Sequence, residues 1–189
     1  MKQVLIIKNM VCDRCIKVVK EELESIGYMT IDVQLGKAVI TFPEEEVDLQ
    51  MAEKVLKKNG FELLLNKNTQ IVEHVKTLII DLIYNGKMEH LNRNISNVIS
   101  TELGKDYSFI SNLFSYTENI TIEKYFILQK IERVKELLSY GELTLSEITF
   151  QLGYSSVQHL SGQFKKVTGL TPSKFRSLKT QNRIPINRL

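Results

Sequence analysis

The chain has few of the residues that several protein classes depend on. Its 189 residues include only two cysteines, too few for a disulfide framework, and three histidines that are scattered along the chain. No apolar stretch approaches the roughly 20 residues of a membrane-spanning helix. The N-terminal segment MKQVLIIKNM has too short an apolar core for a secretory signal peptide. We therefore expect a cytoplasmic protein without a membrane segment.

Catalytic arrangements are also missing. The sequence shows no pair of carboxylates placed for acid–base chemistry, no phosphate-binding glycine loop and no nucleophile with a partner histidine. The chain is therefore not predicted to be an enzyme. Its composition, 43% hydrophobic and 25% charged, is that of an ordinary globular protein, and its length allows one large domain or two small ones.

Acidic residues are absent from the last part of the chain. From Thr149 onward there is no Asp or Glu, whereas four Lys and three Arg occur there. Residues 1–66 carry nine basic against eleven acidic residues, and residues 67–189 carry sixteen against eleven. A locally basic segment favours a polyanionic partner. The charge distribution fits two domains, a regulatory module over 1–66 followed by a nucleic-acid module over 67–189.

Residues 145–176 contain the clearest local pattern. Apolar residues at helical spacing end at Gly153, a residue type that tolerates positive φ and commonly ends a helix. Ser155 and Ser156 are candidate N-caps for a second helix, which carries Val157, Leu160 and Phe164 on its apolar face. Two short helices joined by a tight turn make a helix-turn-helix, whose second helix can enter the major groove of DNA.

A specific motif follows this turn. The run QFKKVTGLTPSKFR occupies Gln163–Arg176, and within it Thr171 is a candidate N-cap with Pro172 at the first helical position. Together with the preceding Gly-Tyr-Ser-Ser and His-Leu-Ser, this run resembles the DNA-binding domain of AraC/XylS-type transcription regulators. The resemblance covers roughly the last half of the chain.

The resemblance implies an all-α domain with two helix-turn-helix motifs joined by a long helix. We expect the motifs at about 90–117 and 144–167 and the connecting helix over 121–139, where apolar residues recur at helical spacing. Asp106 is a candidate N-cap for the second helix of the first motif. Two such motifs on one chain allow a monomer to reach two adjacent segments of the major groove.

Motif positions also imply which residues contact DNA. The residues implied to face the groove are Ser108, Ser111 and Asn112 in the first motif, and Val157, Gln158 and Ser161 in the second. Asn and Gln can each bond adenine through two hydrogen bonds, and Val can pack on a thymine methyl group. The residues implied to contact phosphates are Lys165, Lys166 and Arg176.

Other residues of these helices have simpler predicted roles. The apolar residues predicted to lie in the core are Phe109, Ile110, Leu113, Leu160 and Phe164. For Ser108 and Ser111 the alternative is a solvent-facing position without a base partner. Gly162 stands where the family commonly has a polar reader, so one base contact is expected to be missing there. His159 is predicted to lie on the helix surface.

Residues 1–66 alternate between strand and helix patterns. A β-branched run, two alternating stretches and a closing apolar stretch predict strands, and two segments have apolar residues at helical spacing. The predicted strands are 4–7, 29–35, 38–42 and 61–65, and the predicted helices are 13–26 and 48–58. The order β-α-β-β-α-β predicts a ferredoxin-like domain, and the fold class is therefore α+β.

A Cys-x-x-Cys pair lies between the first strand and the first helix of this domain. The segment NMVCDRC begins at Asn9 and contains Cys12 and Cys15. With the Gly-Phe before the last strand, it resembles heavy-metal-associated domains of copper chaperones and metal ATPases, although Asn9 stands where that family usually has Gly. The resemblance covers about one third of the chain and implies a site for Cu(I) or another soft metal. The helix N-terminus and Arg14 are expected to lower the thiol pKa values.

Two interpretations of the N-terminal domain stay open. In one, Cys12 and Cys15 bind metal and the domain senses it; in the other, the domain is a platform for dimerisation or for another protein, and the cysteines bind nothing. No cofactor is certain. For the whole chain we predict a bacterial-type, sequence-specific transcription regulator, and the alternative is a protein that handles soft metal or senses thiol chemistry.

Overall fold

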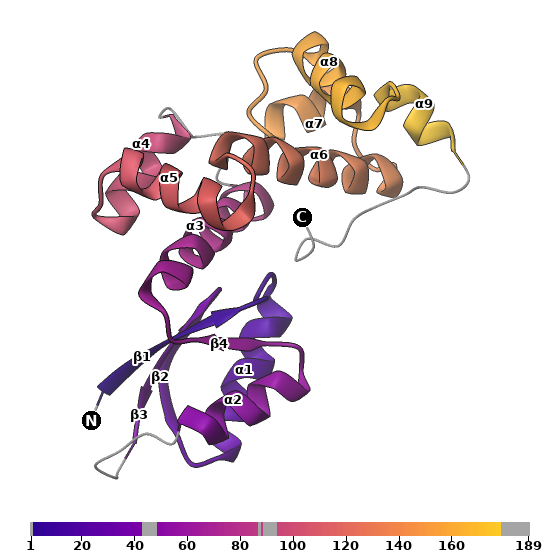
Figure 1. Cartoon of the computed structure of the whole chain (residues 1–189). Helices are drawn as coiled ribbons and strands as arrows, with labels where there is room; N and C mark the ends of the chain where they lie inside the picture. Colours follow the sequence, from indigo (N-terminus) through magenta and orange to yellow (C-terminus); the bar gives the residue numbers. More distant parts are fainter. Residues whose placement is uncertain (1, 43–48, 87, 89–93, 179–189) are drawn as a thin grey trace. The chain divides into compact units, whose positions relative to one another are not determined.

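The computed structural model of the chain describes residues 2–42, 49–86, 88 and 94–178. Two compact units divide the chain, an N-terminal unit over Met1–Thr77 and a C-terminal unit over Leu78–Leu189. The division falls inside helix α3 (Lys67–Tyr84), drawn in purple in Figure 1. The sequence places the domain boundary at the start of this helix, but the first turns of α3 belong with the sheet.

Two observations explain why the first turns of α3 belong with the sheet. The backbone N–H of Asn9, at the end of the first strand, donates to Glu73 Oε1 at 3.3 Å. Gly36, in the turn between two strands, has a φ of +75°, and a Cβ added there would lie 2.7 Å from Thr77 Oγ1. Only glycine allows this backbone conformation together with so close an approach.

The N-terminal unit has the predicted order of elements, β-α-β-β-α-β. Its elements are β1 (Lys2–Lys8), α1 (Asp13–Ser25), β2 (Met29–Gln34), β3 (Lys37–Thr41), α2 (Leu49–Lys58) and β4 (Glu62–Leu64). The strands form one antiparallel sheet in the order β2-β3-β1-β4. Helices α1 and α2 cover one face of this sheet (Figure 1).

The alternation of β1 and β3 builds the core of this unit. Leu5 and Ile7 of β1 pack with Ala38 and Ile40 of β3, and all four are at most 2% exposed. Successive strand residues point to opposite faces, so these alternate positions meet the apolar sides of α1 and α2. The predicted helix start at residue 48 lies outside the described residues.

The C-terminal unit is helical. Its elements after α3 are α4 (Ile95–Leu103), α5 (Tyr107–Glu118), α6 (Ile122–Tyr140), α7 (Leu145–Gln151), α8 (Val157–Thr168) and α9 (Pro172–Ser177). The pairs α4–α5 and α7–α8 pack together, and the long helix α6 contacts α5, α7, α8 and α9. This is the predicted pair of helix-turn-helix motifs joined by a long helix. The predicted start of the first motif near residue 90 lies outside the described residues.

Local capping sets the helix starts. The side chains of Asp106, Thr121, Ser156 and Thr171 each accept a hydrogen bond from a backbone N–H in the first turn of the helix that follows. Thr144 forms a capping box with Glu147 at the start of α7. The caps predicted at Asp106 and Thr171 are confirmed, and of the two candidates Ser155 and Ser156 it is Ser156 that caps α8. Within the described residues, no helix is both long and apolar enough to cross a bilayer.

The two motifs repeat each other. Helices α5 and α8 have 12 residues each and begin 50 positions apart, at Tyr107 and Val157. Each ends in a left-handed residue, Asn119 with a φ of 56° and Gly169 with a φ of 77°. After this residue the chain enters the next helix through a threonine N-cap in both cases.

The same repeat extends to the core. Phe114 of α5 packs edge-on against Tyr125 of α6, with ring centroids 5.6 Å apart. At the equivalent positions Phe164 of α8 packs against Phe175 of α9, with centroids 5.5 Å apart. Edge-to-face geometry is one of the two favoured arrangements of a pair of aromatic rings. The two motifs are therefore built on one plan.

Candidate nucleic-acid interface

Helix α8 presents a polar face away from its core. Leu160 and Phe164 are fully buried, and the helical period therefore turns the intervening positions outward. Of the residues predicted to contact DNA on this helix, Gln158, Lys165 and Lys166 are exposed, and Val157 and Ser161 are half-buried. Gly162 is exposed among them, which leaves a gap between Gln158 and Lys166.

His159 lies on the surface of α8, as predicted. Its Nδ1 is 3.0 Å from the hydroxyl of Ser155, and its ring meets the Tyr154 ring edge-on with centroids 5.4 Å apart. These contacts fix the first turn of α8 against the preceding turn, where Gly153 has the expected positive φ of 62°.

Helix α5 presents the equivalent face of the first motif. Ile110 and Phe114 are fully buried. Of the predicted groove residues, Ser108 and Asn112 are exposed and Ser111 is half-buried. The Ser108 hydroxyl hydrogen-bonds to the capping carboxylate of Asp106, and this interaction lowers the pKa of Asp106.

The prediction that Phe109 lies in the core is wrong. Its side chain is 48% exposed. Each helical residue is rotated about 100° from its neighbour, and the buried positions Ile110 and Phe114 therefore leave Phe109 on the outer side. Leu113, also predicted to be core, is half-buried. Tyr116, which lies two turns after Phe109 in α5, is 87% exposed.

The cysteines lie at the start of α1 in the N-terminal unit. Cys12 is the exposed N-cap residue and Cys15 is half-buried, with their sulfur atoms 3.4 Å apart. Cys15 packs against the core of this unit. Burial raises the pKa of the Cys15 thiol, contrary to the lowering expected from the helix N-terminus and Arg14. Among the described residues no group of three or more His, Cys, Asp or Glu could hold a metal ion.

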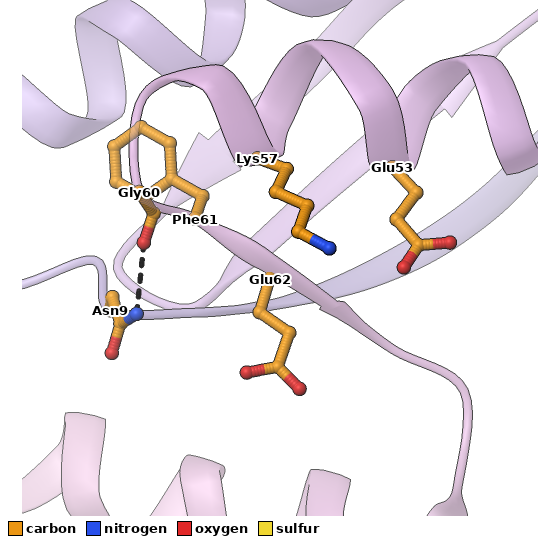
Figure 2. A pocket seen from close by; sticks show the side chains of 6 residues that line it. All are labelled: Asn9, Glu53, Lys57, Gly60, Phe61 and Glu62. Atoms are coloured by element: carbon orange, nitrogen blue, oxygen red, sulfur yellow. Dashed lines mark hydrogen bonds between the residues drawn. The ribbon is translucent and has the colours of Figure 1, made fainter.

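Asn9 preserves the backbone conformation that glycine would allow before this pair. Its φ is +72°, a left-handed value that Asn adopts more readily than most residues. Figure 2 shows its side chain donating to the carbonyl of Gly60 at 2.9 Å. The surrounding pocket, about 350 Å³, is lined by Asn9, Glu53, Lys57, Gly60, Phe61 and Glu62. Its lining mixes two carboxylates with one ammonium group.

The comparisons with known proteins concern the C-terminal unit. Residues 99–177, which run from α4 to α9, match a family model described as a helix-turn-helix domain. Over 80 residues the chain is 31% identical to the Msm operon regulatory protein of Streptococcus mutans, a match that covers 42% of this chain and 29% of that protein. These residues form an AraC/XylS-type helix-turn-helix domain.

Two further comparisons show how far the likeness reaches. Over 69 residues the chain is 36% identical to the xylose operon regulatory protein of Haemophilus influenzae, which covers 36% of this chain and 18% of that protein. The chain thus spans less than a third of the length of these two curated relatives. The C-terminal domain of AraT, a response regulator from Geobacillus stearothermophilus, is similar in fold, with a TM-score of 0.50 and 21% identity over 62% of this chain and 97% of that chain.

The AraC/XylS-type domain braces its second motif through Lys130 of the connecting helix. The Lys130 ammonium lies 3.6 Å from the ring centroid of Tyr154, and the Tyr154 hydroxyl donates to Gln163 Oε1 at 2.7 Å. Burial lowers the pKa of Lys130 to about 8 and raises that of Tyr154, so the phenol keeps its proton. A chain of contacts therefore runs from α6 through the turn to α8.

Sequence reasoning missed Lys130, because a lysine in a helix is usually taken to be exposed. It is 7% exposed here. The ring of Phe126, four residues earlier in α6, lies 5.5 Å from the ammonium, but the closer ring, that of Tyr154, belongs to a different helix-turn segment and no local pattern points to it. The contact is a cation–π interaction, which stabilises the ammonium against the cost of burial.

Arg176, predicted to contact phosphate, also serves the domain itself. Its Nη2 donates to the carbonyl of Leu143 at 2.7 Å, while the residue as a whole is exposed. Leu143 precedes the capping box of α7. Arg176 therefore ties α9 to the start of the second motif and still presents a guanidinium to the outside.

Charge separates the two motifs. The second carries the cations Lys165 and Lys166 in the last turn of α8, whereas α5 has no basic residue in its first or last turn. Cations at the end of a helix also complement its dipole. Of the cations in the basic segment predicted from the sequence, Lys165 and Lys166 lie on the second motif, and Lys174 and Arg176 lie on α9.

Proposed function

We propose that the chain is a sequence-specific transcription regulator of the AraC family, in which α5 and α8 contact adjacent segments of the major groove of double-stranded DNA. The repeat of the two motifs carries this proposal. Two helices of equal length, with equivalent caps and equivalent buried positions, each turn a polar face outward. Two recognition helices on one chain can contact two adjacent segments of the major groove. Other helix-turn-helix proteins achieve this by forming dimers.

The proposed contacts divide into reading and positioning. Gln158 and Asn112 are exposed amides that can each bond adenine, while Val157 offers an apolar surface to a thymine methyl group. Ser108, Ser111 and Ser161 are proposed as weaker groove contacts. The proposed phosphate contacts are Lys165, Lys166 and the exposed guanidinium of Arg176.

The names of the curated relatives support regulation as the outcome of binding. Two of them are described as operon regulatory proteins. A chain with DNA as its partner would act in the cytoplasm of a bacterial-type cell.

Selection of DNA from a random pool at two salt concentrations tests this function. We expect one bipartite site, with two half-sites about one helical turn apart. Gln158→Ala should relax the preference at one position of that site, whereas Gln151→Ala, a half-buried glutamine of α7, should leave the preference unchanged. Binding without any preferred sequence, abolished by salt, would rule the proposal out.

For the N-terminal unit we propose a ferredoxin-like domain that senses a ligand or mediates an interaction, including self-association. The element order β-α-β-β-α-β and the antiparallel strand order β2-β3-β1-β4 support the fold. A role apart from DNA binding fits its charge, since residues 1–66 are acidic on balance.

Soft-metal binding by Cys12 and Cys15 is the second proposed function. The sulfur separation of 3.4 Å and the exposure of Cys12 support it, because two nearby thiolates suit Cu(I). The raised pKa of Cys15 means that binding would release a proton and strengthen as pH rises. Titration with Cu(I) against a chelator tests it: wild type should bind one equivalent that Cys12→Ser loses, and equal binding by both proteins would contradict it.

A further inference from the structure

Helix α5 carries two large exposed side chains on the face that the proposed function turns toward DNA. Phe109 is 48% exposed and Tyr116 is 87% exposed. With the exposed Asn112 they occupy positions i, i+3 and i+7, which lie along one side of a helix. We name Phe109, Asn112 and Tyr116 the α5 stripe.

The repeat shows what the second motif has at these positions. The equivalents in α8, 50 residues later, are His159, Gly162 and Lys166. An apolar ring thus replaces an imidazole, an amide replaces a position without a side chain, and a phenol replaces an ammonium group. The two helices have the same frame but offer DNA different chemistry.

The surroundings of Phe109 leave its ring available. The Lys105 ammonium lies 6.0 Å from the ring centroid, at the start of the helix, where a cation can also reach a phosphate. The ring sits in the first turn of α5, and the N-terminal residues of a recognition helix are the ones that contact base edges. An apolar side chain in the major groove has one apolar target, the C5-methyl group of thymine.

We infer that Phe109 packs on a thymine methyl group and so makes the first motif select A·T base pairs, with Asn112 bonding a neighbouring adenine. This rests on the proposed function and adds the chemistry by which α5 chooses its half-site. The second motif then supplies most of the electrostatic attraction through Lys165 and Lys166, and the first supplies apolar discrimination.

Deoxyuridine tests the inference, because it differs from thymidine only by the missing methyl group. Each thymine of the selected site is replaced in turn, and the affinity of the full chain is measured at one salt concentration. In the half-site opposite to the one where Gln158→Ala relaxes selection, we expect one position to lose about fourfold in affinity, since a buried methyl group contributes roughly 0.8 kcal/mol.

The variant Phe109→Ala should lose the same factor on the thymine site and nothing more on the deoxyuridine site, because the two changes remove one contact. Phe150→Ala is the matched control: Phe150 is 69% exposed on α7, outside the reading face. It should keep the full discrimination between thymine and deoxyuridine.

The outcomes separate the inference from the function on which it rests. Failure to select any site overturns both. A selected site that is indifferent to every methyl group in that half-site, or a Phe109→Ala protein that still discriminates, overturns the inference alone. Unchanged DNA affinity of Phe109→Ala overturns it too.

Discussion

Helices α5 and α8 bury the same two positions and carry different side chains at the exposed ones. Ile110 and Phe114 in the first motif correspond to Leu160 and Phe164 in the second, and all four are fully buried. Core positions of a close-packed domain tolerate little change of volume. The exposed positions face no such limit, and it is there that the two motifs have diverged.

The divergence gives the motifs different kinds of contact. The second has two lysines at the end of α8. Its turn is held to α6 by the contact between Lys130 and the ring of Tyr154. The first has the α5 stripe, in which two rings flank an amide. The two motifs therefore share one architecture, but the second is suited to charged contacts and the first to apolar contacts and hydrogen bonds.

The largest effects should come from the shared core. Phe114→Ala and Phe164→Ala should each cost about 3–5 kcal/mol of unfolding free energy, because each opens a cavity beside an aromatic partner. Urea unfolding followed by circular dichroism checks this, with Phe→Leu at both positions as milder variants. Costs that differ by more than about 2 kcal/mol would show that the two cores are not equivalent.

Removing charge from the second motif should weaken DNA binding next most strongly. The double variant Lys165→Gln and Lys166→Gln should reduce the magnitude of the slope of log affinity against log salt by about 1.8. Its affinity near 0.1 M salt should fall by up to roughly 60-fold. The matched control is Lys57→Gln with Lys58→Gln in α2. An unchanged slope would mean that these lysines do not reach phosphates.

Only the second motif should respond to pH through Lys130. Its pKa of about 8 in the folded protein lies below the ordinary 10.5, and the folded state therefore binds fewer protons than the unfolded state between these values. Stability should rise by about 1–2 kcal/mol from pH 7.5 to 9.5. Hydrogen exchange should show the gain in α8 and not in α5. Lys130→Met should abolish it, and an equal response of both helices would contradict this assignment.

The smallest effects should come from the threonine caps. Thr121→Ala and Thr171→Ala should each cost about 1 kcal/mol, because each removes one hydrogen bond to an N–H of the first turn. Thermal unfolding measures this, with the exposed Thr101→Ala on α4 as the control. A cap variant as stable as that control would show that the cap does not limit stability.

Local signals explain which features could be predicted. The caps Asp106, Ser156 and Thr171 act within a few residues of themselves, and a sequence pattern therefore identifies the helix starts. The alternation over residues 38–42 likewise predicted a strand, which the structure shows as β3 with Ile40 in the core. The candidate groove residues on α8 followed from the motif.

Features that depend on distant residues could not be predicted. Phe109 was assigned to the core because its type is apolar, but the positions of Ile110 and Phe114 decide which side of α5 faces inward. The lowered thiol pKa expected for Cys15 ignored its burial against the core of its unit. The bond from Arg176 to the Leu143 carbonyl joins α9 to a segment far earlier in the chain.

The sequence by itself determined the order of the elements, their caps and the basic character of the chain's end, because these depend on neighbours along the chain. The tertiary structure alone decided which side chains remain outside. Packing of α5 on α6 leaves Phe109 exposed, and packing of the turn before α8 on α6 buries Lys130 under Tyr154. Burial is a property of contacts between segments, and such contacts exist only once the chain has folded.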